Sequence, residues 1–152
     1  MQLTIWSLPS LVALIYAGYA WYLVRKNPSM PGVTAMVWLC ACVMIWTGGQ
    51  LLGTLVTTPS LKLLFAKFES LGAFYTAVCW FWFAVTYARR RQHTSIRFLA
   101  ALAALPTISL LLAFSNEWHQ LIWHAPHVER HYGYVGWFTE PGAWFKVHVV
   151  YC

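Results

Sequence analysis

The stretch VTAMVWLCACVMIWTGGQLLGTLV, residues 33–56, contains no charged side chain and is apolar over most of its length. A helix crosses the hydrocarbon core of a bilayer with about 20 residues, at about 1.5 Å per residue. Three further apolar stretches occupy residues 3–24, 68–88 and 98–114. A soluble domain of this length has no interior that hides so much apolar surface. The sequence therefore predicts an integral membrane protein.

The composition points to the same class. The chain is 60% hydrophobic and 9% charged, whereas soluble proteins carry about 25% charged residues. We predict an all-α, polytopic membrane helix bundle in one region, residues 1–152, with helices at about 3–24, 33–56, 62–88, 98–114 and 143–152. The fifth helix is expected to be incomplete, because ten residues span only about 15 Å. The chain is accordingly interpreted as the N-terminal part of a longer protein.

Residues 115–142 differ from the helices in composition. They combine histidine and aromatic residues with glycine and proline, which predicts a turn-rich outer loop lying against the lipid head groups. The sequence leaves open whether this loop includes a hairpin.

Basic residues are concentrated in alternate connections, which lie on one side of a membrane. These residues are Arg25, Lys26, Arg89, Arg90, Arg91 and Arg97. Because lysine and arginine are in excess in short cytoplasmic loops, we expect the N-terminus outside, and the basic loops inside against anionic head groups. The net charge of +6 does not indicate a nucleic-acid partner, since the aromatic residues lie in lipid-facing helices and not in a solvated basic groove.

Glu69 is the acidic residue that falls within a predicted span. Such residues usually face the bundle interior or a water-filled cavity and mark a functional site. The alternative is that Glu69 extends to water at the outer interface. His119 and His148 are expected at a similar depth, so we predict a ligand site formed by these three polar side chains beneath the aromatic loop.

A metal site is considered and not predicted. His124, His127 and His131 have a spacing that a helical turn can use, but zinc needs three or four converging ligands, and a loop with glycine and proline does not secure them. Independent, solvated histidines are the prediction. The four cysteines are expected to be free thiols. No cofactor is implied, and the four complete helices contain no histidine pair for haem. Catalysis is therefore not expected within residues 1–152.

Three segments together resemble the N-terminal seven-transmembrane sensor region of bacterial histidine kinases, which is also found ahead of diguanylate cyclases. They are FESLG at 68–72 with WFWFAVTY at 80–87, SNEWHQLIW at 115–123, and EPGAWFKVHVVY at 140–151. The resemblance implies residence in the bacterial inner membrane and a bundle that relays a cue to a cytoplasmic output domain beyond residue 152. It also implies that six residues line the outer half of the bundle: Glu69, Asn116, His119, Trp123, Trp144 and His148.

A second function stays open from the sequence. The many aromatic residues and the Gly49/Gly53 pair also suit an accessory or structural subunit of a larger membrane complex, in contact with a pigment, quinone or lipid. Assembly as a homodimer or within a larger complex is left open too. Two more spans and a kinase or cyclase domain after Cys152 would favour the sensor.

Overall fold

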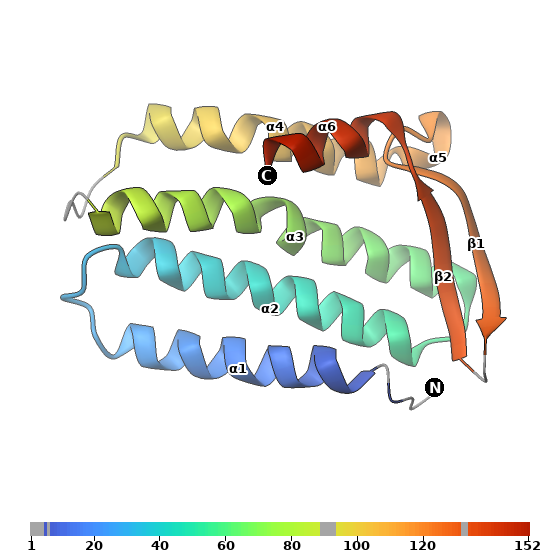
Figure 1. The fold of residues 1–152 in the computed structure, drawn as a ribbon, viewed down its shortest axis with the longest axis horizontal. Coiled ribbons are helices and arrows are strands. Elements are labelled where there is room, and N and C mark those ends of the chain that lie inside the picture. Colours follow the sequence, from blue (N-terminus) through green and yellow to red (C-terminus); the bar gives the residue numbers. More distant parts are fainter. Residues whose placement is uncertain (1–4, 6, 89–93, 132–133) are drawn as a thin grey trace.

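Four long helices lie side by side in the computed structural model, which describes residues 5, 7–88, 94–131 and 134–152 (Figure 1). They are α1 (Ser7–Arg25), α2 (Val33–Leu55), α3 (Pro59–Ala88) and α4 (Ile96–Phe114). Each is long and apolar enough to cross a membrane. The prediction of a multi-pass membrane protein with four spans is confirmed.

The helix boundaries differ from the predicted ones chiefly at α3, which begins at Pro59 and not near residue 62. Proline is tolerated in the first turn of a helix, because the N–H group that it lacks has no partner there. The backbone N–H of Lys62 already donates to the carbonyl of Thr58 at 3.0 Å. The additional turn places Lys62 inside the helix.

The fold is mostly helical, as predicted, but it is not all-α, because residues 115–142 contain a two-stranded sheet. The helix α5 (Asn116–His119) leads into an antiparallel hairpin of β1 (Trp123–His131) and β2 (Tyr134–Pro141). Trp123 pairs with Pro141 at the open end of the hairpin, and the register shifts between His124 and His127. Aromatic and β-branched residues favour strands, and pairing satisfies backbone groups that an unstructured loop would leave to water.

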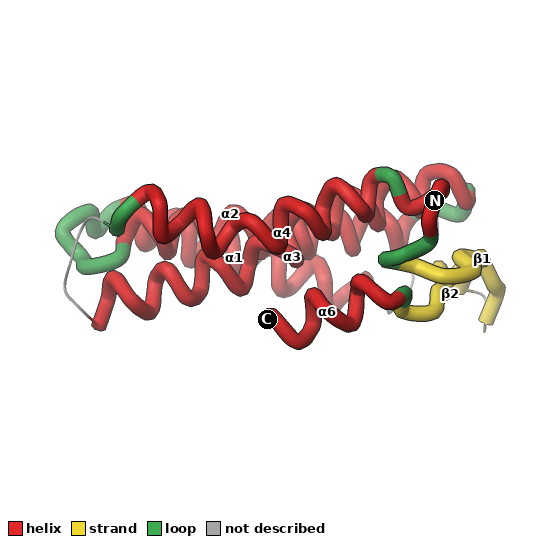
Figure 2. Tube along the Cα trace, turned by 90° about the horizontal axis from the view of Figure 1, so that it is seen from above, coloured by secondary structure: helices red, strands yellow, loops and turns green. Residues whose placement is uncertain are grey.

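The hairpin lies across one end of the helices, the end at which α1 starts and α4 finishes (Figures 1 and 2). From there α6 (Ala143–Tyr151) runs back beside α4. The Tyr151 hydroxyl donates to the carbonyl of Leu102 in α4 at 2.6 Å. Nine residues extend only about 14 Å, so α6 does not cross a bilayer over its described length, and a fifth span stays a prediction.

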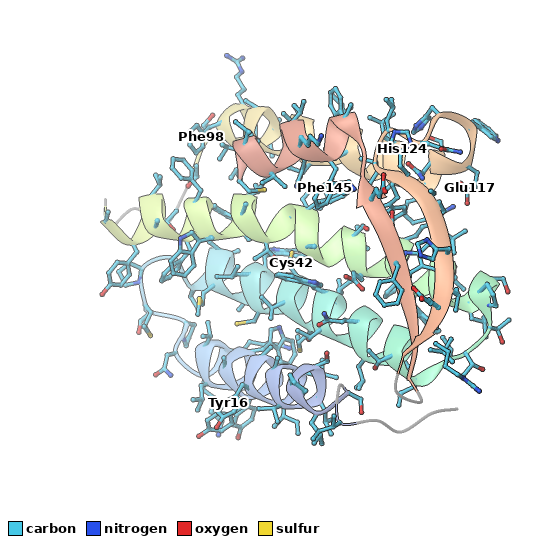
Figure 3. The ribbon with its side chains drawn as sticks, turned by 45° about the vertical axis from the view of Figure 1, so that its right-hand side comes forward. Tyr16, Cys42, Phe98, Glu117, His124 and Phe145 are labelled. Carbon is cyan, nitrogen blue, oxygen red and sulfur yellow. The ribbon has the colours of Figure 1, made fainter. Side chains whose placement is uncertain are left out.

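The closest helix contact joins α2 and α3. An added Cβ at Gly72 of α3 would overlap the backbone of Cys42 and Trp46 in α2, so the absence of a side chain allows these helices to approach. Leu39, Cys42 and Cys79 form a buried cluster beside this contact. Figure 3 shows Cys42 between the two helices and Tyr16 on the side of α1 that faces away from α2. Exposed apolar faces of this kind contact lipid.

Candidate functional site

A cavity of about 200 Å³ lies between α2, α3 and the hairpin. We call it the hairpin cavity, and its lining residues are Gln50, Gly53, Thr54, Lys62, Ala66, Glu69 and Trp137. The small residues Gly53 and Ala66 leave the space between the two helices, while Trp137 of β2 contributes an indole ring from the hairpin. Polar and apolar side chains thus line one half-open cavity, which is the usual character of a ligand site.

Lys62 is the buried cation of this cavity, with only 2% of its surface exposed. Its Nζ donates to the carbonyl oxygen of Gly53 at 2.8 Å. That carbonyl belongs to the last turn of α2, where backbone oxygens have no helical partner and the helix dipole is negative. The bond therefore holds the lysine side chain against α2 and stabilises the end of that helix.

Glu69 lies two helical turns from Lys62 on α3, seven residues along the chain, so both side chains project from the same face. The residue is partly buried against α2, where an added Cβ at Gly49 would lie 2.9 Å from the Glu69 backbone. Among the described residues, no hydrogen bond or ion pair reaches the Glu69 carboxyl group. A carboxyl group in such surroundings requires a donor or a cation.

Gln50 connects the cavity with α1. The hydroxyl of the buried Ser10 donates to Gln50 Oε1 at 3.1 Å, so the amide nitrogen of Gln50 retains its two N–H donors. The hydrogen bond to Ser10 therefore links α1 to the lining of the cavity through Gln50.

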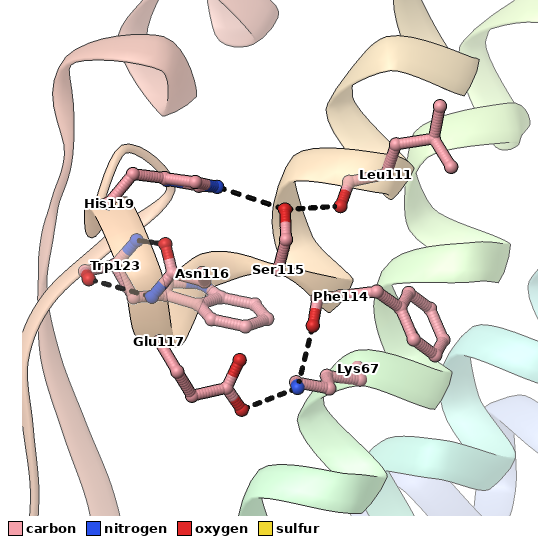
Figure 4. Close-up of polar contacts among 8 residues, drawn as sticks. All are labelled: Lys67, Leu111, Phe114, Ser115, Asn116, Glu117, His119 and Trp123. Atoms are coloured by element: carbon pink, nitrogen blue, oxygen red, sulfur yellow. Dashed lines mark hydrogen bonds and ion pairs between the residues drawn. The ribbon is translucent and has the colours of Figure 1, made fainter.

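Asn116 holds the chain where α5 turns towards the hairpin (Figure 4). Its Oδ1 accepts from the N–H groups of Ile122 at 2.9 Å and Trp123 at 3.1 Å, while its Nδ2 donates to the carbonyl of Trp123 at 3.0 Å. The side chain is buried, at 4% exposure. Asn116 and Trp123 are thus brought together, and the asparagine satisfies backbone groups at the start of β1.

His119 closes the same turn from the other side (Figure 4). The N–H of Leu121 donates to His119 Nδ1 at 3.1 Å, so Nε2 carries the proton of the neutral ring and donates to Ser115 Oγ at 3.0 Å. Ser115 in turn donates to the carbonyl of Leu111 at 2.9 Å. His119 therefore positions the end of α4 and is not directed at the hairpin cavity.

Trp144 and His148 meet at Ser109 of α4. The Ser109 hydroxyl donates to the carbonyl of Leu105 at 2.9 Å and accepts from Trp144 Nε1 at 2.9 Å. His148 Nδ1 lies 2.9 Å from the same oxygen. Because the serine proton is already used, Nδ1 of His148 is the donor there. The ring of His148 also lies 4.3 Å from the ring of Phe74 in α3. His148 of α6 therefore contacts both α3 and α4.

The six predicted site residues consequently fall into three places. Asn116, Trp123 and His119 order the turn after α4, Trp144 and His148 dock α6 on α4, and Glu69 lines the hairpin cavity. No hydrogen bond within the described ranges joins Glu69 to either histidine. In the part of the chain that the structure describes, no group of three metal-ligating side chains occurs, and the side chain of His131 lies outside that part.

The predicted topology residues are described in part. Arg25 lies over the Trp21 ring at 4.6 Å and Lys26 over the Tyr22 ring at 4.4 Å, both at the end of α1. Arg97 is exposed at the start of α4. Figure 1 shows these two helix ends at the same end of the bundle, opposite the hairpin. Arg89, Arg90 and Arg91 lie outside the described residues.

Sequence reasoning missed Lys62, Gln50 and Trp137 as parts of a site. The signal for Lys62 was available, because a lysine within the first turn of a membrane helix is as uncommon as an acidic residue. Gln50 and Trp137 carry no comparable signal, since their approach depends on how the hairpin folds over α2.

The comparison with known proteins gives one family. Residues 6–152 match the family described as the N-terminal 7TM region of histidine kinase. No curated protein and no solved structure matches the chain. The match extends from the start of α1 to the last residue of the sequence and agrees with the four apolar helices. The chain belongs to the N-terminal seven-transmembrane region of histidine kinases.

Proposed function

We propose that this region detects a small molecule in the hairpin cavity and passes the resulting change in helix arrangement to a cytoplasmic output domain. The observation that carries the proposal is the Glu69 carboxyl group in the wall of a cavity between α2 and α3, which forms no hydrogen bond or ion pair with the described residues. A ligand that binds one helix arrangement more tightly shifts the population towards it. Any kinase activity resides outside residues 1–152 in this proposal.

The geometry suits transmission because α3 contributes to the cavity at one end and reaches the basic end of the bundle at the other. Lys62 and Glu69 line the cavity, and the same helix continues to Ala88. A rotation or shift of α3 against α2 would therefore move the helix both at the cavity and at Ala88. Interfaces between packed helices favour discrete arrangements of this kind.

Filling the cavity tests the proposal on the full-length protein. Ala66→Leu places three extra carbons in the hairpin cavity, and Ala84→Leu makes the same change on the same helix at an exposed position. We expect the first variant to change autophosphorylation in lipid nanodiscs by about fivefold or more, within the usual range of allosteric coupling, and the second to leave it unchanged. Equal autophosphorylation in the two variants and the unmodified protein would overturn the proposal.

We further propose that the hairpin lies outside the cytoplasm and the 26–32 connection inside it, in the bacterial inner membrane. The basic residues at the ends of α1 and α4 support this orientation. Single cysteines introduced at Ser29 and at Glu140, in a background in which the four native cysteines are replaced, would test it. A membrane-impermeant maleimide should label only the second in intact cells, and labelling of the first would reverse the orientation.

A further inference from the structure

The hairpin cavity carries two charged groups of opposite sign, separated along one helix. Lys62 and Glu69 lie seven residues apart on α3, which is about 10 Å of helix rise. Both line the cavity, and the small side chain of Ala66 lies between them. The lining therefore has a positive end next to the last turn of α2 and a carboxyl group farther along α3.

The sum of these charges restricts the occupant. The carboxyl group of Glu69 disfavours a simple anion, and the ammonium group of Lys62 disfavours a simple cation. Either ion would also bring an unbalanced charge into surroundings of low polarity. A molecule with one charge of each sign balances the lining. Resting on the function proposed above, we infer that the cavity binds a small zwitterion of the amino-acid type, with its ammonium group towards Glu69 and its anionic group towards Lys62.

Other parts of the lining agree with this assignment. The Glu69 carboxyl group has no protein partner among the described residues and accepts charge-assisted hydrogen bonds from an ammonium group. The indole ring of Trp137 gives the cavity an aromatic wall, and such rings attract ammonium groups.

The size of the cavity sets the size of the ligand. A volume of about 200 Å³ corresponds to six or seven water molecules at roughly 30 Å³ each. A cavity of this volume suits a small molecule better than a peptide or a nucleotide. Lys62 and Glu69 are well separated along α3. This separation favours a zwitterion whose two charged groups are joined by several carbons over one in which a single carbon joins them.

Binding to the full-length protein in lipid nanodiscs tests the inference. The probes are glycine, 4-aminobutanoate and 6-aminohexanoate as zwitterions, with butanoate and butylamine as matched single ions. Titration calorimetry should show binding of at least one of the longer zwitterions, and binding of butanoate and butylamine at least about tenfold weaker, as expected for the loss of one charge-assisted hydrogen bond.

Two variants connect the binding to the cavity. Glu69→Gln keeps the shape of the side chain and should lower the affinity for the zwitterion by about tenfold or more. Glu140→Gln removes a carboxylate from an exposed position of the hairpin and should leave the affinity unchanged. The helical circular dichroism of both variants should equal that of the unmodified protein, which excludes misfolding as the cause.

The outcomes separate this inference from the proposed function. Butylamine binding as tightly as 4-aminobutanoate, full affinity in Glu69→Gln, or no binding of any zwitterion would each overturn the ligand assignment. A zwitterion that binds through Glu69 without changing autophosphorylation would support the assignment and count against the sensory role. A change in autophosphorylation in Ala66→Leu without zwitterion binding would support the sensory role and count against the ligand assignment.

Discussion

Lys62 and Lys67, five residues apart on α3, each donate to a carbonyl at the C-terminal end of a different neighbouring helix. Lys62 Nζ bonds Gly53 of α2 at 2.8 Å, and Lys67 Nζ bonds Phe114 of α4 at 3.0 Å. Five residues rotate a helix face by about 140°, so the two side chains leave α3 in different directions. One helix thus caps both of its neighbours at the hairpin end of the bundle.

The ion pair between Lys67 and Glu117 at this end gives the first prediction. The hydrogen bond from Lys67 Nζ lowers the pKa of Glu117 below its ordinary 4.5, and the positive charge of Lys67 acts in the same direction. A lowered pKa in the folded state means that the stabilisation is present above about pH 4.5 and is lost as the pH falls further.

We expect Glu117→Gln to lower the stability of the detergent-solubilised protein at pH 7 by less than about 1 kcal/mol, because about half of the Glu117 side chain is exposed to solvent. The difference should shrink as the pH is lowered below about 4.5. Thermal unfolding over this pH range would measure it. In a Lys67→Met background Glu117→Gln should have almost no effect, and an undiminished effect there would show that Glu117 acts through another partner.

The thiols of Cys42 and Cys79 give the second prediction. Their Sγ atoms lie 3.7 Å apart across the contact between α2 and α3. A small movement brings them to the 2.05 Å of a disulfide. Treatment with a membrane-permeant oxidant such as diamide should therefore join α2 to α3 within one chain.

A protease site inserted in the 56–58 connection makes the bond visible. After cleavage the two fragments should stay together on a non-reducing gel and separate on a reducing one. Cys40→Ser should not alter this result, whereas Cys42→Ser or Cys79→Ser should abolish it. Cross-linking that survives Cys79→Ser would contradict the packing of these helices.

Two glycines of the α2–α3 region give the third prediction. A Cβ at Gly72 would overlap backbone atoms of α2, whereas a Cβ at Gly48 would meet nothing within 4 Å. Gly72→Ala should therefore destabilise the bundle by about 1–3 kcal/mol, the usual cost of overpacking. Gly48→Ala should be neutral or slightly stabilising, because alanine is the better helix former. Unfolding in a denaturing detergent would compare them, and equal stabilities would show that the helices are less close.

The side chain of Asn116 gives the fourth prediction. Asn116→Ala leaves the buried N–H groups of Ile122 and Trp123 without their acceptor, at a cost of about 1–3 kcal/mol for such a group. Asn116→Asp keeps the acceptor and loses the donor to Trp123, so it should be milder. Hydrogen exchange at Ile122 would report the change, and an exchange rate equal in Asn116→Ala and the unmodified protein would refute it.

The sequence predicts the helices well because membrane helices are read from apolar length alone. The hairpin is harder to predict, because its two strands are defined by the backbone hydrogen bonds between them and not by a pattern within either strand. Of the Gly49/Gly53 pair noted in the sequence, Gly49 does approach α3, but Gly72 is the more tightly packed glycine. Which glycine meets a backbone depends on helix rotation, which composition does not encode.

The candidate site shows the same limit. Glu69 is recognisable because a carboxyl group is rare in an apolar helix, and the structure places it on a cavity wall. The partner of Lys67 has no local signal in the sequence, because helical pairs lie one turn apart, whereas Glu117 lies 50 residues along the chain. Contacts between distant segments follow from the fold and not from local spacing.

The pairing of Trp123 with Pro141 means that the chain departs from the bundle and rejoins it at nearly the same point. An appendage attached in this way has a closed base, so its tip can be lengthened, shortened or rewritten while α4 and α6 keep their places. Changes at the tip of the hairpin are thus separated from the packing of the membrane helices.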